Sequence, residues 1–67
     1  MLYGDLSKGM VVRLTSGGPQ MTVEDYEHPG DWYTSSGKKR YVDVDCVWFQ
    51  DGVIKRATFN SSLLQKV

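Results

Sequence analysis

Gly-Met-Val-Val-Arg-Leu-Thr-Ser-Gly-Gly-Pro-Gln-Met-Thr-Val, residues 9–23, contains two short apolar segments joined by a glycine-rich turn. A period of two places Met10, Val12 and Leu14 on one face of its first half, which predicts a half-buried strand. Met21 and Val23 repeat the alternation after a Ser-Gly-Gly-Pro segment. Glycine adopts positive φ without steric cost, and proline extends the residue before it. We therefore expect a β-hairpin with a four-residue connection over residues 16–19.

The paired glycines also suggest a phosphate-binding loop, and this alternative is weaker. Such loops open a helix and carry a lysine and a hydroxyl residue at fixed spacing. Gly17 and Gly18 lie between two strand patterns, and the segment lacks the lysine. The need for a turn accounts for both glycines.

A second hairpin is predicted around Asp51-Gly52. A two-residue type I′ turn at this point pairs Phe49 with Ile54 and Val44 with Phe59. On the core face, this register places Val42, Val44, Cys46, Trp48, Ala57 and Phe59. On the opposite face, it leaves Val47, Phe49 and Ile54 beside polar residues.

The C-terminal tail changes period after this second hairpin. Asn60 is a favourable N-cap residue, and Phe59 with Leu64 matches a hydrophobic staple. We expect one helical turn that closes the end of a barrel with Leu63, Leu64 or Val67. The expected fold is all-β, a small SH3-like barrel of four to five antiparallel strands with a short C-terminal helical turn.

Length and composition indicate one small domain over residues 1–67. A chain of this size buries only about 60% of its unfolded surface, so its core is thin and self-association is a further source of stability. Eight basic and eight acidic side chains give a net charge of zero, which argues against attraction of the whole surface to nucleic acid or membranes. The single cysteine precludes an internal disulfide, and no apolar run suits secretion or membrane insertion. We expect a cytoplasmic protein.

Several short motifs resemble a known family. Val11-Val12-Arg13-Leu14, Ser16-Gly17-Gly18-Pro19 and Met21-Thr22-Val23 resemble the opening of the small bacterial YodC-like proteins, whose function is unknown. The resemblance returns at Cys46, at Trp48-Phe49 and at Ala57-Thr58-Phe59. Two features depart from the family pattern. Met10 stands at a position where the family often has aspartate, and the segment from about Glu27 to Arg40 is longer than in the family. The resemblance implies a compact β protein from bacteria or their phages, with no activity to carry over.

The apolar side chains on the outer face form the first candidate site. Val47, Phe49 and Ile54, joined by Val11, make a cluster of the kind that marks a protein interface. The alternative is cover by the chain's own loop, with Trp32 and Tyr33 across the cluster. The preferred function is a non-enzymatic binding module that acts through protein–protein contact. Its simplest partner is a second copy, in a homodimer that segment exchange through the loop can also form.

A basic segment beside aromatic residues forms the second candidate site. Lys38, Lys39 and Arg40, with Tyr33 and Tyr41, combine cations for phosphates with rings for unpaired bases. This pattern supports the alternative function, a nucleic-acid-binding accessory module. Three cations are also typical of a solvated loop, and we favour this interpretation over a nucleic-acid contact. Within the loop, residues 32–34 suggest a short strand and residues 35–37 a turn.

No residue pattern indicates an enzyme, a metal site, a cofactor or a small-molecule substrate. Cys46 falls on the predicted core face, where a thiol is a packing residue. His28 has no second nitrogen or sulfur ligand nearby, so a structural zinc site is excluded. Asp43 and Asp45 share a strand face but lack the apolar pocket that separates the pKa values of a catalytic pair.

Overall fold

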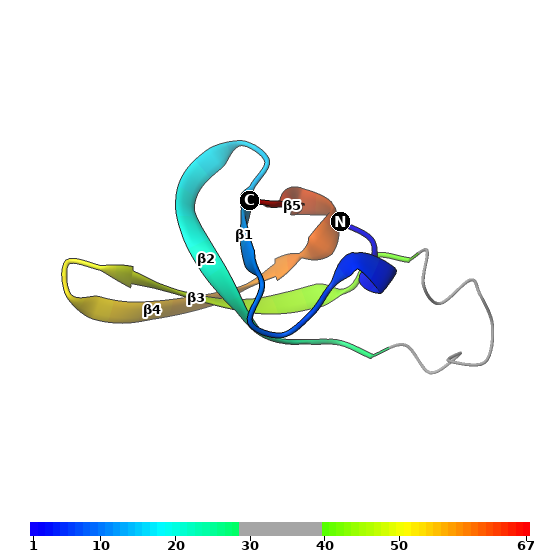
Figure 1. The fold of residues 1–67 in the computed structure, drawn as a ribbon, viewed down its shortest axis with the longest axis horizontal. Helices are drawn as coiled ribbons and strands as arrows, with labels where there is room; N and C mark the ends of the chain where they lie inside the picture. Colours follow the sequence, from blue (N-terminus) through cyan, green and yellow to red (C-terminus); the bar gives the residue numbers. More distant parts are fainter. Residues whose placement is uncertain (29–39) are drawn as a thin grey trace.

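A computed structural model describes residues 1–28 and 40–67 of the chain. Within these residues, five strands form one antiparallel sheet in the order β4-β3-β2-β1-β5 (Figure 1). The strands are β1 Val11–Leu14, β2 Gly17–Tyr26, β3 Asp43–Gln50, β4 Val53–Asn60 and β5 Leu64–Lys66. The 3-10 turns η1 and η3 span Tyr3–Asp5 and Ser61–Leu63. The expected all-β class, the five antiparallel strands and the short C-terminal helical turn are confirmed, and the connectivity is consistent with an SH3-like barrel.

The register predicted around Asp51-Gly52 is confirmed. Strands β3 and β4 pair without interruption from Asp43↔Asn60 to Gln50↔Val53. Asp51 has φ 54° and Gly52 has φ 76°, which are the two positive values that a type I′ turn requires. The alternation of side chains along this hairpin is therefore the one expected from the sequence.

The first hairpin reverses earlier than predicted. The turn lies at residues 15 and 16, and Leu14 already pairs with Gly17, so the expected four-residue connection over residues 16–19 is wrong. Strand pairing shifts between Val12↔Met21 and Leu14↔Gly17, which leaves residues 18–20 opposite a single residue of β1. Gly17 and Gly18 have φ values of 110° and 101°. Their conformational freedom thus serves a bulge at the start of β2, since left-handed backbone is costly for other residues.

A small core lies on the inner face of the curved sheet. Met21 and Val23 are buried, and the residues between and after them are exposed, as the alternation predicted. The buried hydrophobic residues are Leu6, Val12, Met21, Val23, Val42, Val44, Cys46 and Leu64. Trp48 and Phe59 pack against this cluster and are half-buried. The core is thin, as expected for a chain of this length.

The C-terminal turn closes the sheet through backbone contacts. Asn60 caps η3, because its Oδ1 accepts a hydrogen bond of 3.0 Å from the backbone N–H of Ser62. Ser61 is fully buried; its Oγ accepts from the N–H of Val42 at 3.0 Å, and its own N–H donates to the Val42 carbonyl at 2.7 Å. Leu64 is buried after the turn, whereas Leu63 is 51% exposed.

The tail continues as a strand rather than as a helix. β5 pairs with β1 at Leu14↔Leu64, so the last strand runs beside the first. The Met1 ammonium group donates to the carbonyls of Ser61 and Leu64, which places the two ends of the chain together (Figure 1). Among the described residues, no helix has the length and apolar character needed to cross a membrane.

Candidate functional site

A fork in the sheet creates the candidate site. The pairing of β2 with β3 ends at Thr22↔Val47, although β3 continues to Gln50. Beyond that point β2 stays with β1, while β3 and β4 project away as a two-stranded ribbon (Figure 1). The two branches leave a space between them.

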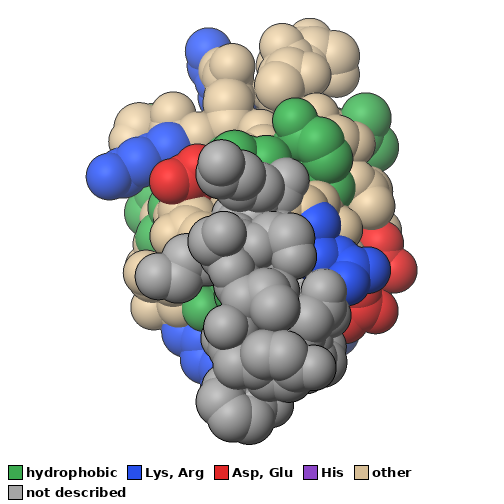
Figure 2. All heavy atoms as spheres, turned by 90° about the vertical axis from the view of Figure 1, so that its right-hand side faces the viewer, with side chains coloured by type: hydrophobic (Ala, Val, Ile, Leu, Met, Phe, Trp, Pro, Cys, Tyr) green, Lys and Arg blue, Asp and Glu red, His purple; other side chains and the backbone are tan. Residues whose placement is uncertain are grey.

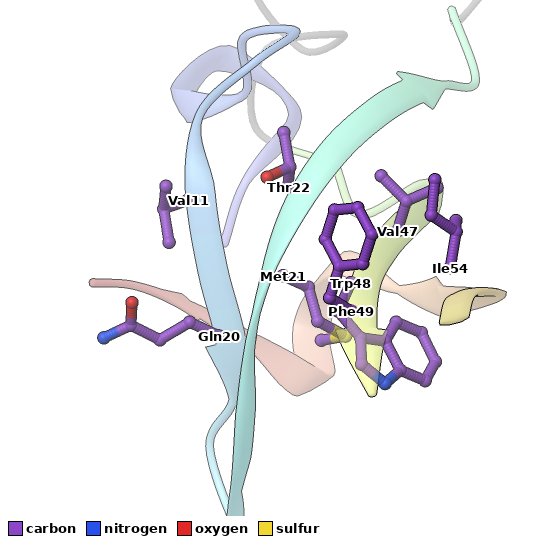
Figure 3. Close-up of a pocket in the computed structure, with 8 residues that line it drawn as sticks. All are labelled: Val11, Gln20, Met21, Thr22, Val47, Trp48, Phe49 and Ile54. Atoms are coloured by element: carbon purple, nitrogen blue, oxygen red, sulfur yellow. The ribbon is translucent and has the colours of Figure 1, made fainter. Parts of the chain in front are cut away.

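This space is a hollow of about 290 Å³. Its lining residues are Val11, Gln20, Met21, Thr22, Val47, Trp48, Phe49 and Ile54, and we call it the apolar hollow. Figure 3 shows Val47, Phe49 and Ile54 on the ribbon side and Val11 on the β1 side. All four residues of the predicted interface therefore line the same hollow.

The rim of the apolar hollow is exposed to solvent. The exposed fraction is 73% for Phe49, 54% for Ile54 and 40% for Val11, and Val47 is half-buried. None of the described lining residues is charged, and those with polar side chains are Gln20 and Thr22. Such a surface gains free energy when an apolar side chain covers it, since burial removes apolar area from water.

Four lining residues were missed by the sequence reasoning. Met21 and Trp48 belong to the core face by parity, and Gln20 and Thr22 are polar. At the fork the strands separate, so side chains from both faces of the sheet reach the same space. Trp48 packs against the core and also lines the hollow, which explains why it is only half-buried. The local sequence carries no signal for the fork, because the fork depends on where β2 separates from β3 in the folded chain.

The second candidate site lies mostly outside the described residues. Tyr33, Lys38 and Lys39 lie there, as do the strand expected at residues 32–34 and the residues expected to cover the apolar cluster. Arg40 and Tyr41 are exposed, and the Arg40 carbonyl accepts a hydrogen bond of 2.8 Å from the N–H of Tyr3. Figure 2 shows both basic and acidic side chains on the described surface of this end.

Two exposed carboxylates, those of Asp25 and Asp45, interact with a basic or a hydroxyl side chain. Lys8 Nζ lies 3.5 Å from the carboxylate of Asp25, and Thr58 Oγ1 donates to Asp45 at 2.7 Å. The pKa of Asp25 is lowered, chiefly because its carboxylate accepts a hydrogen bond from the backbone N–H of Tyr26. Within residues 1–28 and 40–67, no group of three or more side chains is arranged to hold a metal ion.

Cys46 occupies the core position predicted for it. Its side chain is fully buried, and burial raises the pKa of the thiol, with the neighbouring Asp45 carboxylate adding to the effect. A protonated thiol is a poor nucleophile and a poor metal ligand. The structure therefore places this residue among the packing residues of the sheet.

A family model described as "Uncharacterized small protein (DUF2158)" matches residues 7–64. The chain belongs to this DUF2158 family. The expectation of a small uncharacterized family is thus confirmed, and the matched range contains every residue that lines the apolar hollow. No curated protein and no solved structure matches this DUF2158 member.

Proposed function

We propose that this DUF2158 protein is a non-enzymatic binding module that acts through protein–protein contact at the apolar hollow. The observation that carries the proposal is the position of Phe49, whose ring is 73% exposed beside a concave apolar surface. Large exposed aromatic side chains next to a hollow are typical of interface anchors. The simplest partner is a second copy of the chain, in a homodimer.

Self-association is the simplest form of this contact, because the same surface carries both an exposed ring and a concave apolar region. A two-fold contact uses the same patch on both copies, so a projecting group and its receptor must both lie on that patch. Phe49 projects at the rim, and Val11 and Met21 line the receiving side. The net charge of zero also leaves two copies without mutual long-range repulsion.

A small-molecule ligand is a poorer occupant of the apolar hollow. Ligand pockets usually measure roughly 300–1,000 Å³ and present several convergent polar groups. This hollow measures about 290 Å³. Its polar side chains, Gln20 and Thr22, are both exposed at its surface. This volume lies near the lower limit of that range, so the shortage of convergent polar groups, rather than the size, favours a side chain from a protein surface.

Two adjacent residues of β4 provide a matched test. Ile54 and Val53 are 54% and 53% exposed, but only Ile54 lines the hollow. We expect Ile54→Asp to weaken self-association in sedimentation velocity over a wide concentration range, and Val53→Asp to leave it nearly unchanged. A wild-type protein that stays monomeric at millimolar concentration, or equal effects of the two variants, contradicts the proposal.

We also infer that the protein is a YodC-like bacterial protein and that it resides in the cytoplasm. The motifs that support the resemblance, from Val11-Val12-Arg13-Leu14 to Ala57-Thr58-Phe59, all fall within the range matched by the DUF2158 model. The neutral composition and the single buried cysteine are compatible with a reducing compartment. Expression with a compartment marker in a bacterial host, followed by fractionation, tests the location.

A further inference from the structure

The unpaired edge of β4 is a second surface that is suited to binding a partner. Among the described residues, β4 pairs on one side only, with β3, and its eight residues pair without a bulge. The opposite edge of the sheet is β5, which is three residues long. Long regular edges are templates for further strand pairing, whereas short edges are protected from it.

The hairpin geometry determines which backbone groups face this edge. A two-residue type I′ turn closes on a hydrogen-bonded pair, here Gln50↔Val53. In an antiparallel ladder, hydrogen-bonded and non-hydrogen-bonded pairs alternate. The backbone groups of Val53 and Lys55 therefore point to β3, and those of Ile54, Arg56 and Thr58 point outward. The outward groups can accept and donate to an added strand.

We propose that β4 pairs antiparallel with β4 of a second copy, about a two-fold axis that passes between the two Ala57 residues. This register joins outward-facing groups only, because it places Arg56 opposite the second copy's Thr58 and Ile54 opposite its Asn60. The two sheets then form one continuous sheet. The contact is separate from the apolar hollow and does not rest on the proposed function.

Charge disfavours the registers whose two-fold axis lies closer to the turn at Asp51-Gly52. An axis at Arg56 sets the two guanidinium groups directly opposite each other, and an axis at Lys55 does the same for two ammonium groups. Like charges in directly opposed positions destabilise a sheet. The axis at Ala57 instead places Arg56 beside a threonine hydroxyl that holds the Asp45 carboxylate at 2.7 Å. It also sets Lys55 opposite the half-buried ring of Phe59, where a cation is well accommodated.

The shape of the ribbon supports a second copy as the occupant. Beyond Val47 and Arg56, the described part of the chain adds no further strand to the hairpin, and Phe49, Val53 and Ile54 are exposed there. A two-stranded ribbon is marginally stable in water without further packing. Pairing at the β4 edge adds a third strand to its base. The zero net charge of the chain again favours contact between identical copies.

Amide hydrogen exchange tests the proposal residue by residue. We expect the N–H groups of Ile54, Arg56 and Thr58 to exchange at least tenfold more slowly as the protein concentration is raised from micromolar to millimolar. The N–H groups of Val53 and Lys55 lie in the ladder with β3 and serve as internal controls. If the three outward amides exchange without protection at every concentration, the proposal is overturned. The same result is expected if the edge instead binds an extended segment of a different protein, since that protein is not in the sample.

Two substitutions at Arg56 separate backbone pairing from charge. Arg56→Pro removes an outward N–H without removing a bond to β3, whereas Arg56→Ala keeps the N–H. Both variants lose the contact of 3.8 Å between Arg56 and Glu24. We expect Arg56→Pro to abolish the concentration-dependent protection of Ile54 and Thr58, and Arg56→Ala to retain it. Equal protection in the two variants overturns the proposal; if Arg56→Pro fails to fold, the concentration dependence of wild-type exchange decides.

The proposed β4 contact and the proposed contact at the apolar hollow can be tested separately. Phe49→Asp disrupts the hollow but leaves the outward groups of β4 intact, so slowed exchange at Ile54 and Thr58 is expected to persist in that variant. A protein that uses both contacts forms assemblies larger than a dimer, and a protein that uses either one forms a dimer. Loss of β4 protection in Phe49→Asp overturns the independent β4 contact.

Discussion

Replacement of Phe49 by alanine tests the binding surface most directly, and its effect follows from the exposure of the ring. Full burial of a phenylalanine side chain contributes about 3 kcal/mol at most. Since 73% of this side chain is exposed in the single copy, association can bury an additional share worth about 2 kcal/mol. A two-fold contact contains the residue twice, so Phe49→Ala is expected to weaken association by about 4 kcal/mol, or roughly 1,000-fold in Kd.

The fluorescence of Trp48 reports on this contact, because its indole lines the apolar hollow. The assay is a dilution series of a Trp32→Phe background, which leaves Trp48 as the single tryptophan. The control is Leu63→Ala in the same background. Leu63 is 51% exposed and lies on η3, outside the hollow. We expect the midpoint of the Trp48 transition to move by orders of magnitude for Phe49→Ala and to stay in place for Leu63→Ala. A shift of less than threefold for Phe49→Ala refutes the assignment of the hollow as the contact surface.

Two further predictions concern stability. Ser61→Ala leaves the buried N–H of Val42 without its acceptor, so we expect a loss of about 1–3 kcal/mol and a fall in Tm of roughly 5–20 °C by calorimetry. The exposed neighbour provides the control, and an effect of Ser62→Ala as large as that of Ser61→Ala contradicts this reasoning. The lowered pKa of Asp25 stabilises the folded state above its ordinary value of 3.8, and this contribution is lost as the pH falls below that value. Acid unfolding of Asp25→Asn should accordingly depend less on pH below about 4 than that of the wild type, and identical slopes would show that Asp25 is not responsible.

Local chemistry made the second hairpin predictable. Asp-Gly is a strong signal for a two-residue type I′ turn, and side-chain parity then assigns every residue of both strands to a face. The burial of Val44 and Cys46 and the exposure of Phe49 and Ile54 follow from that one turn. The first hairpin was less predictable, because glycines permit positive φ in a turn and in a bulge alike. Gly17 and Gly18 serve the bulge.

The all-β class, the register around Asp51-Gly52 and the set of apolar side chains that point away from the core could all be predicted from the amino-acid sequence, since these depend on turn chemistry and on a period of two. The sequence also grouped Val11 with Phe49 and Ile54, but the folded chain was needed to show that β1 and the projecting ribbon place them around one concave hollow. Only the tertiary structure decided that Trp48 serves both the core and that hollow. The physical reason is the fork at Thr22↔Val47: where β2 leaves β3, contacts depend on the path of strands far apart in the chain, and local alternation carries no information about that path.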